Sequence, residues 1–174
     1  MFGEDNSNNF YDNVIKADYT LSFQFPKLTF MFPENDAYVG EWFVLPIGLD
    51  NNAIRNTVSS YSLLEKKDVV TLLKKRGRFD HKGKFGHGLL VSGSSGKMGA
   101  CVLGAGAALR TGIGLITCHV PSCGSLVLNA SVPEAMVRHD KSEEIISDIG
   151  NTDNFDAVGV GPGLGTDKKT QKAL

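Results

Sequence analysis

The chain has 174 residues, of which 41% are hydrophobic and 21% are charged, and its formal net charge is −1. This near-neutral balance argues against bulk electrostatic attraction to nucleic acid or to an anionic membrane, and neither is expected as a partner. The polar start, MFGEDNSNNF, lacks the basic and apolar regions of a secretory signal, and the three cysteines have no metal-binding spacing. The composition therefore predicts a soluble cytoplasmic protein without a metal site.

The first 50 residues predict the end of a sheet. Residues 18–25 alternate around Leu21, Phe23 and Phe25, which favours a half-buried strand. Residues 41–47 are aromatic and aliphatic, and Pro46 favours an edge or a terminus for this second strand. Two strands are marginal as an independent core.

A polar, irregular run over 51–62 is the best candidate for a linker. Residues 63–75 predict a short helix, in which charged residues separate the leucines and valines. The following run over 74–84, KKRGRFDHKGK, is dense in positive charge and has Phe79 as its one aromatic residue. A basic patch for nucleic acid is one interpretation, and a solvated segment between domains is the favoured one.

From residue 85 onward, strand patterns alternate with helix patterns. Strands are predicted at 88–92, 115–120 and 155–160, with a smaller one at 134–137. Helices are predicted at 97–111, 122–130 and 141–149, the first and the last ended by a glycine. The strand at 155–160 is apolar enough to be buried on both faces. The alternation predicts a parallel α/β sheet with right-handed crossovers.

A glycine-rich turn, GSSGKMG at 93–99, joins the first of these strands to a helix. It is not a P-loop, because Val91 stands where that motif needs glycine and Met98 stands where it needs serine or threonine. Backbone N–H groups at the start of the helix still favour an anion. The alternative is that the glycines only turn the chain and the small residues pack the helix on the sheet.

A second glycine-rich turn, GVGPGLG at 159–165, follows the last predicted strand. Pro162 fixes φ, and the glycines exceed what a tight turn needs, which favours close approach of a ligand over a purely structural turn. In an open α/β sheet both turns would lie at the carboxyl ends of their strands, where ligands bind. The pair therefore predicts a site for a nucleotide-like ligand.

Isolated polar residues carry weaker signals. Histidines flank the first turn or sit within a strand, and two aspartates bracket the second turn: His81, His87, His119, Asp156 and Asp167. The histidines are interpreted as surface or packing residues, and the aspartates as capping or solvated. No Ser-His-Asp, zinc or paired-carboxylate arrangement is supported.

Three ordered segments together closely resemble the NAD(P)H-hydrate dehydratase family. They are HKGKFGHGLLVSGSSGKMGACVLGAGAALRTGIGLITCHVP at 81–121, VPEAMV at 132–137 and DAVGVGPGLGTD at 156–167. The resemblance covers about residues 63–174 and implies a ribokinase-like fold with a three-layer sheet, here incomplete. Residues 14–50 resemble the closing strands of the Rossmann-like NAD(P)H-hydrate epimerase domain, through IKADYTLSFQFPK and GEWFVLPIGLD, and FGEDN at 2–6 resembles a loop of the same domain. The expected domains are an epimerase remnant at 1–50, a linker at 51–62 and the dehydratase part at 63–174.

The resemblance implies repair of damaged nicotinamide cofactors. In this family ADP or ATP, with Mg²⁺, phosphorylates the ring hydroxyl of hydrated NADH or NADPH, and elimination restores the cofactor; the epimerase interconverts the two stereoisomers of the hydrate. Ala100 and Gly163 match family positions that line the hydrated-cofactor site. The intact protein is expected to be a homo-oligomer.

The resemblance implies that a later glycine-and-aspartate motif supplies the catalytic base and the contacts to the nucleotide phosphates. This motif has no counterpart before Leu174. No catalytic residue is therefore assigned. The chain is expected to be a fragment or a truncated product that lacks both activities by itself. Two alternatives stay open: a catalytically dead nucleotide-binding module, and a small-molecule kinase of the same fold, against which GKMGA and VPEAMV argue.

Overall fold

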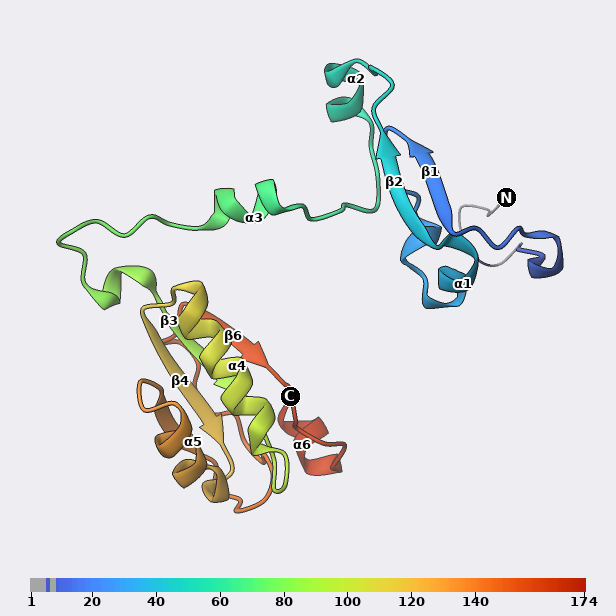
Figure 1. Ribbon diagram of the computed structural model, residues 1–174. Coiled ribbons are helices and arrows are strands. Elements are labelled where there is room, and N and C mark those ends of the chain that lie inside the picture. Colours follow the sequence, from blue (N-terminus) through green and yellow to red (C-terminus); the bar gives the residue numbers. More distant parts are fainter. Residues whose placement is uncertain (1–5, 7–8) are drawn as a thin grey trace. The chain divides into compact units, whose positions relative to one another are not determined.

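The computed structural model describes Asn6 and residues 9–174 (Figure 1). These residues form two compact units, divided between Glu65 and Lys66. The opening residues of the expected epimerase remnant, 1–5 and 7–8, lie outside the described part. In the described part no helix is long and apolar enough to cross a lipid bilayer.

The first unit contains a two-stranded parallel sheet of β1 (Tyr19–Phe23) and β2 (Glu41–Leu45). Short helical turns precede and connect the strands: η1 (Tyr11–Asn13), η2 (Leu28–Met31), η3 (Pro33–Asn35) and α1 (Asp36–Val39). The run predicted as an irregular linker begins with a short helix, α2 (Asn51–Asn56). This helix forms because the Asp50 carboxylate accepts a hydrogen bond from the Ala53 N–H and caps it.

The burial of β1 is the reverse of the predicted one. Leu21 and Phe23 are each 64% exposed, whereas Ser22 between them is buried. The connection between the strands covers the other face, where the Thr20 hydroxyl donates to the Val39 carbonyl. The alternation correctly predicted a strand, but the covering segment decided which face is buried.

The second unit contains a four-stranded parallel sheet in the order β5-β4-β3-β6. Its strands are β3 (His87–Val91), β4 (Leu115–Val120), β5 (Met136–His139) and β6 (Ala157–Val160). Its helices are α3 (Lys66–Leu72), η4 (Lys82–Phe85), α4 (Met98–Thr111), η5 (Ser122–Gly124), α5 (Ser125–Ser131) and α6 (Lys168–Ala173). The predicted parallel α/β sheet is confirmed.

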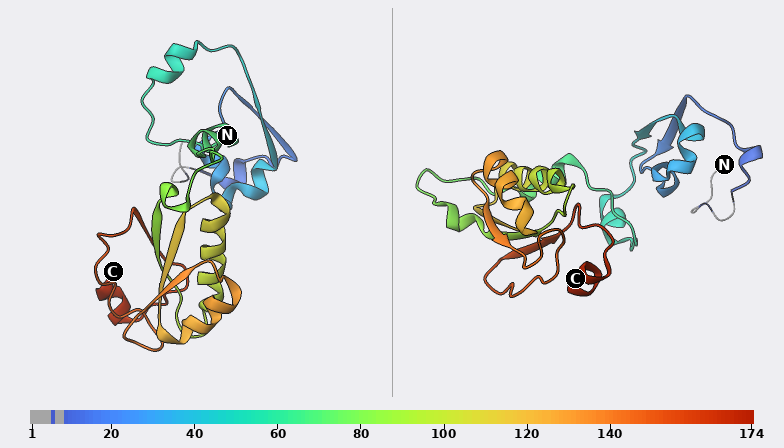
Figure 2. Two further views of the ribbon diagram at one scale, coloured as in Figure 1. Left: turned by 90° about the vertical axis from the view of Figure 1, so that its left-hand side faces the viewer. Right: turned by 90° about the horizontal axis from the view of Figure 1, so that it is seen from below.

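Helices α4 and α5 cover one face of this sheet, and α6 lies on the opposite side (Figure 2). The core between helices and sheet is built from small and aliphatic side chains: Met98, Cys101, Ala105, Ile116, Cys118, Val120, Leu128, Val132 and Ala135. On the other face Ile146 packs on Leu89 and Val91 of β3. Strand β6 is exposed, with Val160 at 53%, because it pairs only with β3 among the described strands. The prediction that it is buried on both faces was wrong.

The segment that carries Ile146 is not the predicted helix. Residues 141–151, which we call the strap, contain bends and irregular backbone. The Asp140 carboxylate accepts hydrogen bonds from the N–H groups of Ser142, Ser147 and Asp148, so it offers these groups an alternative to helical pairing. The apolar spacing therefore reflects burial of an irregular segment rather than helix formation.

Candidate functional site

The two glycine-rich turns meet at the carboxyl ends of β3 and β6. Because Val91 pairs with Val160 in the ladder, the chain leaves both strands at the same edge of the sheet. The Pro162 carbonyl accepts the Gly93 N–H at 2.9 Å and the Ser92 hydroxyl at 2.7 Å. The Ser94 hydroxyl donates to the Gly163 carbonyl at 2.7 Å. These hydrogen bonds hold one turn to the other.

This junction brings Ala100 and Gly163 together. Ala100 lies in the first turn of α4, and Gly163 has a φ of +79°. A Cβ built on Gly163 would lie 3.0 Å from the Ala100 Cβ and 3.0 Å from the Lys97 carbonyl oxygen. Both the left-handed backbone and the close approach therefore require glycine here.

Positive potential is concentrated beside the same junction. No side-chain hydrogen bond caps the start of α4, although the Ala100 N–H donates to the Lys97 carbonyl at 3.2 Å, and the helix N-terminus carries partial positive charge. The Lys97 ammonium lies 3.9 Å from the point where a Cβ on Gly165 would stand. Backbone N–H donors at a helix N-terminus, next to a lysine ammonium, suit a flat ligand that carries phosphate.

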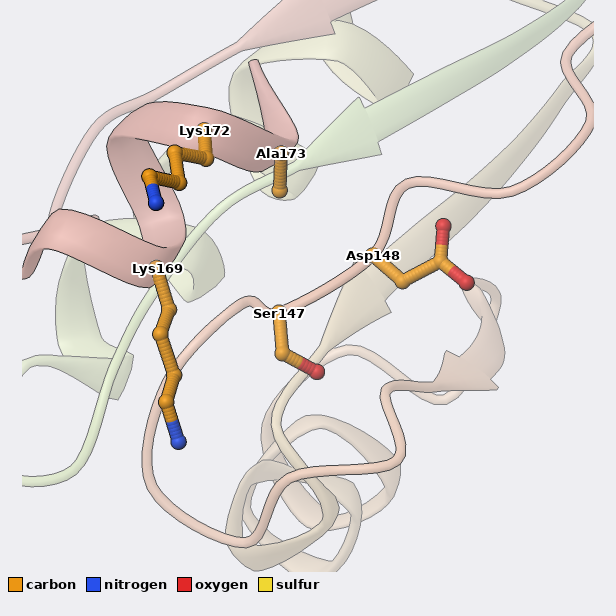
Figure 3. A pocket seen from close by; sticks show the side chains of 5 residues that line it. All are labelled: Ser147, Asp148, Lys169, Lys172 and Ala173. Atoms are coloured by element: carbon orange, nitrogen blue, oxygen red, sulfur yellow. The ribbon is translucent and has the colours of Figure 1, made fainter.

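The strap contacts the first glycine-rich turn, at 93–99, and α6. The Ser95 N–H donates to the Glu144 carbonyl at 2.7 Å, and the Thr170 hydroxyl donates to the Ile146 carbonyl at 2.8 Å. A pocket of about 420 Å³ lies between the strap and α6. Figure 3 shows Lys169 of α6 opposite Ser147 of the strap across this pocket. Neither Ala100 nor Gly163 lines it, so it is a neighbour of the junction and not the junction itself.

Among the residues singled out from the sequence, His81 is exposed, and the other two histidines and the two aspartates have structural partners. The His87 ring lies 2.8 Å from the Thr117 hydroxyl, and the His119 ring is buried against the Asp148 carbonyl at 2.9 Å. Asp156 accepts the His87 N–H, and Asp167 caps α6. Within the described residues no three His, Cys, Asp or Glu side chains converge in a way that could hold a metal ion.

Sequence reasoning missed the strap as part of this region. Glu144 contributes through its backbone carbonyl, which leaves no signal in residue type. Asp140 left a weak signal, since an aspartate two residues before Ser142 is typical of a local side-chain-to-backbone turn. The apolar spacing of Ile145, Ile146 and Ile149 outweighed that signal and led to the helix prediction.

Comparisons with known proteins agree on one family. A model of the NAD(P)H-hydrate dehydratase family matches residues 88–174. The bifunctional NAD(P)H-hydrate repair enzyme Nnr of Coxiella burnetii is 34% identical over 157 residues, which are 87% of this chain and 31% of the relative. The ADP-dependent (S)-NAD(P)H-hydrate dehydratase of Staphylococcus aureus is 34% identical over 117 residues, or 67% of this chain and 41% of the relative. The chain spans about a third of the length of the bifunctional relatives it matches.

Solved structures agree on the fold. A ribokinase-like superfamily protein from Enterococcus faecalis superposes with a TM-score of 0.52 and 26% identity, over 64% of this chain and 41% of that one. The ADP/ATP-dependent NAD(P)H-hydrate dehydratase of Bacillus subtilis, co-crystallised with ATP and Mg²⁺, gives a TM-score of 0.50 and 26% identity, over 63% and 39%. The expected ribokinase-like α/β fold is confirmed, while assignment of residues 1–50 to an epimerase domain stays a prediction.

Proposed function

The chain belongs to the NAD(P)H-hydrate dehydratase family, and from this premise we propose that it forms the hydrated-cofactor side of a dehydratase site. The substrate would be hydrated NADH or NADPH, and loss of water driven by ADP or ATP would restore the cofactor. The observation that carries the proposal is the contact of Ala100 with Gly163, where the two glycine-rich turns meet.

The junction supports this substrate class through its shape and its charge. With a methyl group at Ala100 and no side chain at Gly163, the two turns approach each other closely, and a ribose or a nicotinamide ring would meet backbone at this junction. The α4 N–H groups and the Lys97 ammonium favour the phosphates that such a dinucleotide carries. We assign these residues to binding and orientation, and we assign no residue of this chain as the catalytic base.

An adenine nucleotide would be the second ligand. The Staphylococcus relative is named as ADP-dependent, and the Bacillus structure was crystallised with ATP and Mg²⁺. No metal-binding cluster occurs among the residues described, so we propose that Mg²⁺ would accompany the nucleotide phosphates rather than occupy a site made by this chain. When bound, it would neutralise phosphate charge.

The first 50 residues would belong to an epimerase domain. Relatives named as bifunctional repair enzymes match 87% to 94% of this chain, which is more than its second unit alone provides. A homo-oligomer and a cytoplasmic location remain predictions.

Binding of NADPH hydrate tests the proposal, measured by calorimetric titration with the wild-type chain, Gly163→Ala and Gly48→Ala. Both glycines have a positive φ, at +79° and +75°, so both substitutions carry a similar backbone cost. A Cβ would be crowded only at Gly163, since nothing lies within 4 Å of the corresponding point at Gly48. We expect Gly163→Ala to weaken binding at least about tenfold and Gly48→Ala to leave it unchanged. Equal affinities for all three proteins would remove Gly163 from the site.

A further inference from the structure

Asp140 is a buried carboxylate directly after β5. It is 5% exposed, and donors from the following residues surround it. One oxygen accepts the Ser142 N–H at 2.7 Å and the Ser147 hydroxyl at 2.5 Å, and the other accepts the N–H groups of Ser147 at 2.8 Å and Asp148 at 3.1 Å. A buried charge is costly unless it is paired in this way, so the strap takes its path where the donors can reach Asp140.

Side chains of β4 and β5 also bind this arrangement. The His119 Nε2 lies 3.3 Å from the Asp140 carboxylate and 2.9 Å from the Asp148 carbonyl. The Arg138 Nε donates to His119 Nδ1 at 3.1 Å, which leaves the imidazole proton on Nε2, facing the strap. The Arg138 guanidinium also donates to the carbonyls of Ile149 and Asn151. The C-terminal end of the strap is therefore fastened to β4 and β5, while the carbonyls of Ser142 and Glu143 at its other end accept the N–H groups of Ser122 and Cys123 in η5.

The middle of the strap reaches both glycine-rich turns. The Glu144 carbonyl accepts the N–H of Ser95, which lies in the first turn. The Ile146 side chain is fully buried in the cluster against which Leu164 of the second turn packs. A displacement of the strap would therefore act on the elements that carry Ala100 and Gly163.

We propose that Asp140 is a positioning residue for the hydrated-cofactor site: through the strap, it sets the placement of the two turns that the substrate contacts. This inference rests on the proposed function. Asp140 does not touch the substrate. Its effect on binding passes through the Ser142, Ser147 and Asp148 donors to Glu144 and Ile146, and from there to Ser95 and Leu164.

The test compares Asp140→Asn, Ser147→Ala and the control Asp153→Asn, all in the full chain. Asp140→Asn replaces one carboxylate oxygen by an amide NH₂ group, so a donor would face the donor N–H groups of the strap. Ser147→Ala removes only the hydrogen bond from the Ser147 hydroxyl. Asp153 is exposed, and its carboxylate accepts a hydrogen bond from the nearby Asn151 side chain. Two quantities are measured: hydrogen exchange at the Ser95 amide and the affinity for NADPH hydrate.

We expect Asp140→Asn to accelerate Ser95 exchange and to weaken NADPH hydrate binding, each about tenfold, and Ser147→Ala to do so about threefold. Asp153→Asn should change neither quantity. Exchange at the Leu90 amide, in a central strand, follows unfolding of the whole unit, so it reports the general loss of stability in each variant.

The proposal is overturned if Asp140→Asn changes neither the exchange of the Ser95 amide nor the affinity for NADPH hydrate. If Asp140→Asn does not fold, the same two measurements on Ser147→Ala decide the question. Faster exchange in Asp140→Asn together with an unchanged affinity for NADPH hydrate would also overturn it, since Asp140 would then only stabilise the whole unit. If the wild-type chain does not bind NADPH hydrate, the proposed function is wrong. Ser95 exchange would still decide whether Asp140 positions the first turn.

Discussion

The Asp140 carboxylate shows how a residue remains ionised in a protein interior. Burial alone would raise its pKa, but the hydrogen bonds from Ser147, Ser142 and Asp148 outweigh burial and lower the pKa to about 2. The ordinary value for this group is 3.8. Folding is therefore linked to deprotonation of this single side chain.

This linkage predicts an acid-sensitive contribution to stability. Because the pKa is lower in the folded state, the contribution is fully present above pH 3.8 and is lost as the pH falls toward 2. It amounts to about 2 kcal/mol, from the difference between the two pKa values. Urea unfolding of the second unit at several pH values between 6 and 2 measures it, with Asp140→Asn as the variant that lacks it. Parallel pH profiles for wild type and Asp140→Asn would contradict the assignment.

Among the elements, α4 has the clearest stop signal. It was predicted over 97–111 and runs over Met98–Thr111, and Gly112 then ends it in the left-handed conformation with a φ of +103°. The Gly112 N–H donates to the Leu109 carbonyl, and this carbonyl of the last turn thereby gains a hydrogen-bond partner. Local sequence suffices here because the N–H groups of Gly112 and Ile113, which close the helix end, bond to carbonyls of α4 itself.

Two glycine substitutions in and after α4 should have opposite effects. Gly112→Ala places a Cβ in the left-handed region and should lower the free energy of unfolding by about 1 kcal/mol. Gly106→Ala lies inside the helix with nothing within 4 Å of the new Cβ, and it should raise that free energy by roughly 0.5–1 kcal/mol. Chemical denaturation of both variants checks the signs. A loss of stability in Gly106→Ala would mean that this face of α4 is packed.

The strap is the element for which local sequence was misleading. Ile146 and Ile149 have helical spacing, yet the backbone there binds Asp140 instead of itself. Ile146 is buried all the same on β3, and Ile149 is partly buried against the same cluster. A periodic apolar pattern reports which residues are covered, and it does not by itself distinguish a helix from an irregular segment held by a carboxylate.

At the scale of the whole molecule, the two units differ in how much apolar surface they bury. In the described part of the first unit, Val39 is the one buried hydrophobic residue, while aromatic side chains such as Phe43 remain 43% exposed. The second unit has a continuous core on one face of its sheet and a smaller cluster on the other. Stability should follow this difference, because burial of apolar surface is the main force that opposes chain entropy.

We therefore expect two separate unfolding transitions. Trp42 is the single tryptophan of the chain and lies in β2, so its fluorescence reports the first unit. Circular dichroism at 222 nm follows mainly the second unit, which contains α4. The fluorescence midpoint should fall at a lower urea concentration than the dichroism midpoint. Coincident midpoints would show that the two units unfold as one.

The sequence by itself determined the parallel α/β sheet, the limits of α4, the two glycine-rich turns and, through family resemblance, the choice of Ala100 and Gly163. The first three of these follow from periodicity, from a glycine that ends the helix and from residues whose conformational needs are local. Only the tertiary structure decided that Leu21 and Phe23 face outward and that the strap runs irregularly from Asp140 to join both turns. The reason is physical: which face is covered, and which carbonyl a donor finds, depend on segments distant in the chain, and residue type along one segment does not encode them.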